Sequence, residues 1–96
     1  MTSEQAEHEF DAGIQNIQQE IINKLREAGL DASVDSFRWH RNKDLSLCPE
    51  SLGFEVHVNN KKAEAILART YLEDSCQKVD RPEVIAIIKS VVSALL

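Results

Sequence analysis

The stretch GFEVHVNNKKAEAIL, residues 53–67, decides the fold of this chain. In its first half apolar and polar residues alternate strictly, which is typical of a strand with one buried and one exposed face. Asn59 and Asn60 follow, and asparagine tolerates the positive φ angles of a tight hairpin turn. The pattern therefore predicts a β-hairpin whose first strand begins at Gly53.

The turn also fixes which side chains share a face. A two-residue turn at 59–60 pairs FEVHV with AEAIL. One face of the hairpin then carries Phe54, Val56, Val58, Ala63, Ala65 and Leu67. A helix over residues 61–74 competes with the second strand, since Ala, Glu, Leu and Lys are good helix formers. We favour the strand, because a strand that begins at Gly53 needs an antiparallel partner.

A long amphipathic helix precedes this hairpin, over residues 3–28. Its apolar stripe consists of Phe10, Ile14, Ile17, Ile21 and Leu25. Thr2 and Gln5 form a capping-box pattern at its start, and Gly29 marks its end. We expect residues 1–9 to project or fray, because they carry little to bury.

The segment between helix and hairpin predicts a further strand. DASVDSFRWH, residues 31–40, is rich in β-branched and aromatic side chains, but its alternation slips by one between Val34 and Phe37. Either a bulge at Asp35–Ser36 or a strand that starts only at Ser36 explains the slip. The following residues, about 41–52, predict a loop.

Two helices follow the hairpin. Thr70 with Glu73 predicts a short helix YLEDSCQKV, residues 71–79. Asp80 with Glu83, and a proline in the first turn, predict the last helix over 81–95. The fold class is α+β in the order α-β-β-β-α-α, a single domain over residues 1–96 with the helices packed on one face of a three-stranded antiparallel sheet.

Charge is distributed unevenly along the chain. The net charge is −5, to which residues 1–35 contribute −6, residues 36–70 contribute +2 and residues 71–96 contribute −1. The overall field repels nucleic acid. The helix–three strands–helix order resembles the double-stranded-RNA-binding fold in outline, but the last helix begins DRPE and lacks a lysine-rich start for gripping phosphates. We therefore favour a partner other than nucleic acid and keep nucleic-acid binding only as an alternative.

The start of the chain and the cysteines indicate the compartment. Residues 1–11, MTSEQAEHEFD, have neither the basic nor the apolar region of a signal peptide. The longest apolar run, residues 84–96, falls short of the roughly 20 residues that span a bilayer. We expect a soluble, cytoplasmic protein without a membrane partner, in which Cys48 and Cys76 are free thiols.

The last helix predicts self-association. Its apolar arc is wider than one covered face requires, so either the sheet and the first helix cover two sides of it, or Ile85, Val92 and Leu96 contact a second chain. We name these three residues as candidate partner-binding residues and expect a homodimer.

The sequence gives little support for catalysis or metal binding. No His or Cys pair has the short spacing of a zinc site, although His40, Cys48 and His57 could converge if their strands are neighbours. Cys48 with His40 is a conceivable nucleophile pair, but no orienting residue is evident. Glycine-rich phosphate loops and hydrolase motifs are absent from the sequence. We expect no enzyme activity, no metal and no cofactor.

The strip SFRWHRNK, residues 36–43, is the second candidate site. Arg38, Trp39, His40 and Arg41 suit a small ligand or anion, with the 42–52 loop alongside and the indole as a wall, and the same residue types suit nucleic acid. A strand divides the strip, however, turning Phe37 and Trp39 inward and the cations outward.

The function that we expect is a non-enzymatic protein-interaction or regulatory module, homodimeric, with the anion or nucleic-acid binder as the alternative. The sequence identifies neither a partner nor a ligand.

Overall fold

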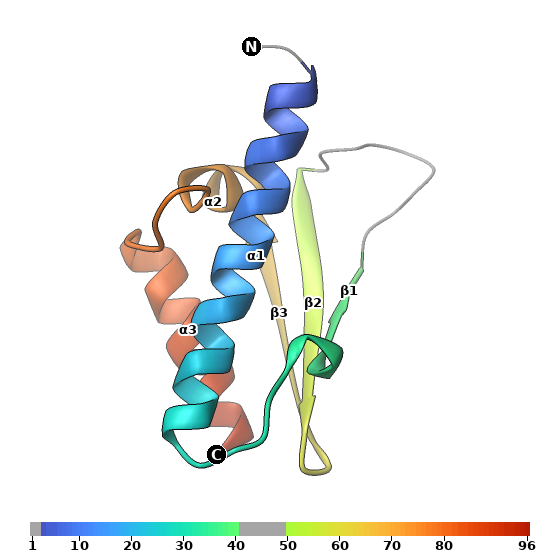
Figure 1. Cartoon of the computed structure of the whole chain (residues 1–96), viewed down its shortest axis with the longest axis vertical. Helices are drawn as coiled ribbons and strands as arrows, with labels where there is room; N and C mark the ends of the chain where they lie inside the picture. The colour runs from blue at the N-terminus through green and yellow to red at the C-terminus, as the bar shows by residue number, and fades with distance from the viewer. Residues whose placement is uncertain (1–2, 41–49) are drawn as a thin grey trace.

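The computed structural model describes residues 3–40 and 50–96, with side chains from His8 onward. The elements are α1 (Ser3–Glu27), the 3-10 turn η1 (Val34–Ser36), β1 (Phe37–Trp39), β2 (Ser51–Val58), β3 (Lys61–Ala68), α2 (Arg69–Asp74) and α3 (Pro82–Leu95). The sheet is antiparallel with strand order β1-β2-β3. The predicted α+β fold is confirmed (Figure 1).

The β2–β3 hairpin turns at the two asparagines. Asn59 and Asn60 have φ angles of 51° and 67°, which is the left-handed conformation that a tight hairpin turn requires. Val58 therefore pairs with Lys61, and the same register pairs Val56 with Ala63. The strand prediction is confirmed, and the competing helix is wrong for residues 61–68, where β3 lies, while its last six residues are helical as α2.

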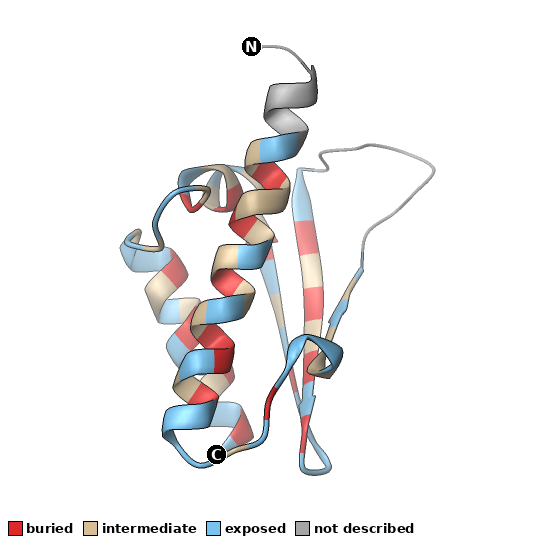
Figure 2. Ribbon diagram, in the orientation of Figure 1, coloured by how far each residue is buried: buried red, intermediate tan, exposed pale blue. Residues whose placement is uncertain are grey.

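The helices pack on one face of this sheet and enclose a single core (Figure 2). The largest fully buried side chains come from both layers: Phe10, Ile17, Ile21, Ile22 and Leu25 of α1, Leu52, Phe54 and Val56 of β2, Leu67 of β3, Leu72 of α2, and Ile88 and Leu95 of α3. α1 ends at Glu27, one residue before the predicted end, and Gly29 terminates it as predicted, with a φ of +87° and a hydrogen bond from Leu30 N to Leu25 O. None of the helices among the described residues could span a membrane.

The start of the sheet differs from the prediction in detail. The slip in alternation comes from η1, a 3-10 turn that precedes β1, so the strand begins at Phe37 rather than at a bulge or at Ser36. β2 begins at Ser51, before the predicted Gly53, because Leu52 continues the buried face of the strand. Thr2 lies outside the described residues.

The short helix is α2, and it lies earlier than predicted. It begins directly after β3 with Ala68 as N-cap, so Thr70 is inside the helix and caps nothing. It ends at Asp74, and the Asn16 side chain of α1 donates to the carbonyls of Ser75 and Cys76 just beyond this end, at 2.8 and 3.0 Å. This contact joins residues distant in sequence, which a local pattern could not predict.

The last helix begins one residue later than its capping pattern predicts. Arg81 is the N-cap and makes no side-chain cap hydrogen bond, while Pro82 occupies the first turn as expected. The Arg81 guanidinium instead pairs with the carboxylates of Asp74 and Glu83 and lies over the ring of Tyr71, 4.6 Å from its centroid. Arg81 thereby ties the start of α3 to α2.

Gly13 is where α1 and α2 meet. It is buried in the helix, and a Cβ built at this position would lie 1.8 Å from the carbonyl oxygen of Leu72. The two backbones can approach this closely only because residue 13 has no side chain.

We predict that Gly13→Ala destabilises the protein by about 3 kcal/mol or more, the upper end for an overpacked core, although alanine is the better helix former. Urea unfolding measures the change. Gly29→Ala is the matched control: nothing lies within 4 Å of its Cβ position, and only the positive φ is strained, at a cost of about 1 kcal/mol. Equal losses in the two variants would contradict close packing at Gly13.

Candidate functional site

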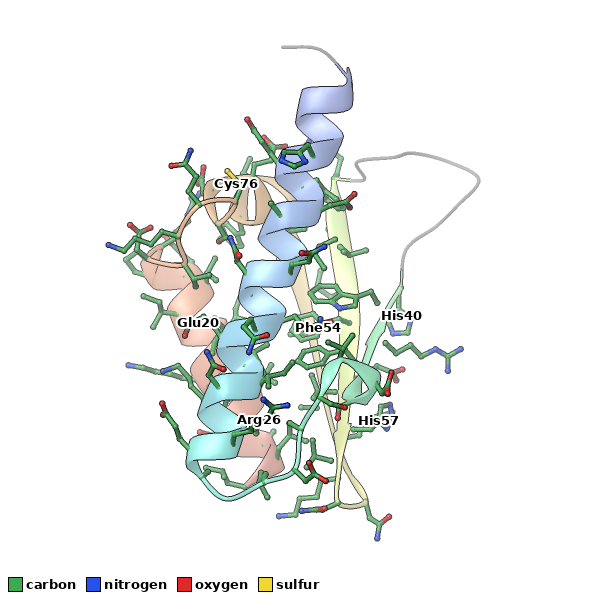
Figure 3. All side chains as sticks on the ribbon, viewed as in Figure 1. Glu20, Arg26, His40, Phe54, His57 and Cys76 are labelled. Carbon is green, nitrogen blue, oxygen red and sulfur yellow. The ribbon has the colours of Figure 1, made fainter. Side chains whose placement is uncertain are left out.

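The candidate site is the face of the sheet that points away from the helices. We call it the outer face. It carries Arg38 and His40, Gly53, Glu55 and His57 of β2, and Lys62, Glu64 and Ile66 of β3, as the alternation of the paired strands requires. No helix of the described ranges covers it (Figure 1). Figure 3 shows His40 and His57 on this side, whereas Phe54 points toward the helices.

Glu55 is the centre of a charged cluster on the outer face. Its side chain is only 15% exposed, and its Oε2 lies 3.5 Å from His40 Nε2 and 3.8 Å from His57 Nε2. Lys62 Nζ lies 3.5 Å from Glu55 Oε1 and 2.9 Å from Glu64 Oε1. Neighbouring strands bring these groups together, since Glu55 pairs with Glu64 and His57 with Lys62. We call these five residues the Glu55 cluster.

Lys62 and Glu64 form an ion pair at the open side of this cluster, and each shifts the pKa of the other. A hydrogen bond from Lys62, and then the charge of its ammonium, lowers the pKa of Glu64 below its ordinary value. The hydrogen bond to Glu64, followed by the charges of Glu64 and Glu55, raises the pKa of Lys62. A lowered carboxyl pKa stabilises the fold above the ordinary carboxyl pKa, and this contribution is lost as pH falls through the lowered value.

A hollow of about 640 Å³ lies beside the cluster. Its lining residues are His40, Gly53, Phe54, Glu55, Glu64, Ala65 and Ile66. Gly53 contributes no side chain to it, and a Cβ there would lie 3.6 Å from the His40 ring and 3.8 Å from Ile66 Cγ1, at ordinary contact distance. Ile66 is 70% exposed at this hollow. The hollow therefore has an apolar floor and a charged rim.

The free edge of β3 adjoins the hollow. Arg69 N donates to Glu50 O at 2.8 Å, so the odd-numbered residues of β3 direct their backbone groups toward β2. Lys62, Glu64 and Ile66 consequently direct their N–H and C=O groups away from the sheet. Within residues 3–40 and 50–96, β3 pairs with β2 alone. An eight-residue edge of this kind can accept another strand.

The predicted ligand strip is divided by the strand, as its alternation indicated. Arg38 and His40 lie exposed on the outer face, and Arg41 with residues 42–49 lies outside the described residues. Trp39 lies on the helix side, where its Nε1 donates to Gln18 Oε1 at 2.9 Å and its ring lies 4.6 Å from that of Phe54. Trp39 thus shares no surface with Arg38 and cannot form a ligand wall with it.

The predicted partner-binding flank of α3 is largely covered within the chain. Ile85 and Val92 are half-buried, and Val92 packs against the core. Leu96 is 60% exposed, and its carbonyl accepts a hydrogen bond from Lys61 Nζ at 2.8 Å. The sequence analysis missed Ile66, although its signal is present: in AEAIL the isoleucine falls on the polar face of the predicted hairpin.

The described residues contain no candidate metal centre. They contain no group of three His, Cys, Asp or Glu side chains that could hold a metal ion. His40 and His57 do approach the same carboxylate, but the Lys62 ammonium also lies beside it. Cys48 lies outside the described residues, and Cys76 is a half-buried free thiol.

Comparison of the chain with family models, with curated proteins and with solved structures gives no match in any of the three.

We predict that Lys62→Gln raises the pKa of Glu64 toward the ordinary carboxyl value, because the substitution removes the ammonium that stabilises the carboxylate. A carbon-13 NMR titration of the Glu64 carboxyl group measures the change. Lys89→Gln on the exposed side of α3 serves as the control and leaves Glu64 unchanged. A Glu64 titration that is the same in all three proteins would show that the pair does not form in solution.

Proposed function

We propose that the protein is a non-enzymatic, cytoplasmic interaction module that self-associates and binds protein chains through the outer face and the free edge of β3. The observation that carries the proposal is Ile66, which is 70% exposed on a face that no described helix covers. Large apolar side chains beside a hollow and an open strand edge are typical of sites that receive another chain.

The energetics of this surface suit protein recognition. Burial of an isoleucine side chain contributes about 1.5–3 kcal/mol, which corresponds to roughly tenfold to hundredfold in affinity. The free edge of β3 adds backbone hydrogen bonds that are independent of sequence. The charged rim, with both signs present, favours partners whose charges match it.

The same rim argues against the alternative of an anion or nucleic-acid binder. Arg38 and Lys62 supply positive charge on the outer face, but Glu55 and Glu64 supply equal negative charge between them. A net charge of −5 opposes polyanions further. A surface of balanced charge does not concentrate phosphates, so a protein partner is the better assignment.

We predict that Ile66→Lys abolishes the association of tagged protein with partner chains from the native host, because the substitution places a charge where an apolar side chain is buried on binding. Quantitative co-purification compares it with the wild-type protein. Val34→Lys is the matched control, since Val34 is 62% exposed but lies in η1, away from the outer face.

The proposal requires that Val34→Lys keeps every partner that Ile66→Lys loses. Retention of the same partners by both variants would exclude the outer face as the binding surface.

A further inference from the structure

We infer that a second copy of this chain pairs with the free edge of β3, antiparallel across a two-fold axis, with Lys62 of each copy opposite Glu64 of the other. The inference rests on the self-association in the proposed function and names its contact. The result is one continuous sheet formed from the three strands of each copy.

The backbone of β3 limits how two copies can pair. Only the even-numbered residues of β3 direct N–H and C=O groups toward the free edge, so only they can exchange hydrogen bonds with the partner. Their side chains, Lys62, Glu64 and Ile66, all lie on the outer face and are exposed. Pairing therefore brings together the outer-face side chains of both copies.

Several registers pair even-numbered residues with each other, and charge decides between them. If Glu64 faced its own copy, two carboxylates would lie directly opposite each other, and Lys62 would face Ile66. If Ile66 faced its own copy, Glu64 would face Ala68, and pairing would reach the residues at which α2 begins. Only with Lys62 opposite Glu64 do opposite charges face each other at both symmetry-related positions.

This register extends contacts that already exist within one copy. Lys62 Nζ lies 2.9 Å from Glu64 Oε1 of its own chain, two positions along the strand. Across the axis, each lysine gains the glutamate of the other copy, and the charges alternate in sign around a ring. Ile66 faces the turn residue Asn60 of the other copy, at the end of the paired segment, so it stays available to a further protein.

The two outer faces then lie on the same side of the joined sheet, because the axis is perpendicular to it. The hollow beside Gly53 and the Glu55 cluster occur once in each copy. A dimer therefore presents them twice on one surface, which gives a further partner a two-fold symmetric site.

The experiment uses two single charge reversals of the full chain, Lys62→Glu and Glu64→Lys, measured alone and as an equimolar mixture by analytical ultracentrifugation. Alone, each variant faces like charges at both positions, and we expect its dimer to weaken about tenfold. In the mixture the charges are complementary again, so heterodimers form with wild-type affinity. The double reversal in one chain restores the homodimer for the same reason.

Thermal unfolding of each variant serves as the folding control. The mixture is a second control, because it restores dimer formation with the same two variant chains and no further substitution. A wild-type protein that stays monomeric at high concentration would overturn both the inference and the self-association. The binding of other proteins would still be tested separately by Ile66→Lys. A dimer that neither reversal weakens, but that Ile85→Lys with Leu96→Lys disrupts, would place the contact on α3. That result would overturn the inference and leave the proposed self-association intact.

Discussion

The turn at Asn59 and Asn60 is the constraint on which the rest of the structure depends. Their left-handed backbone closes the hairpin in two residues and sets the register of β2 against β3. A shift of one residue would turn Phe54 and Val56 away from the helices and the Glu55 cluster into the core. The helices can cover the sheet, and the charged side chains can stay in water, only in the observed register.

The same constraint leaves the outer face free for the binding that we propose. Within the part of the chain that the structure describes, the helices cover one face of the sheet, and the three strands leave the other face and the edge of β3 uncovered. Gly53 and Ile66 lie opposite each other across the hairpin, so the missing side chain of one exposes the apolar side chain of the other. The proposed binding surface and the hydrophobic core thus lie on opposite faces of the same strands.

Sequence reasoning succeeded where the deciding contacts are local and periodic. Alternation and the Asn-Asn turn predicted the hairpin, and helical spacing predicted α1 and α3 within a residue or two. It failed where contacts between distant residues decide: the Asn16 side chain binds the carbonyls that follow α2, and the backbone carbonyl of Leu72 leaves no room for a side chain at Gly13. For the site, the pleat separated Arg38 from Trp39 as expected. The wide apolar arc of α3 pointed to a partner surface, but the sheet and α1 already cover most of it.

Amide hydrogen exchange of β3 tests the central claim, that its free edge is a binding surface for a second copy, most directly. The amides of Lys61, Ala63, Ala65 and Leu67 point toward β2 and should be protected at every protein concentration. We predict that the amides of Lys62 and Glu64 become protected only as the concentration rises and dimers form. Fast exchange of both amides at concentrations where the protein is dimeric would contradict the account.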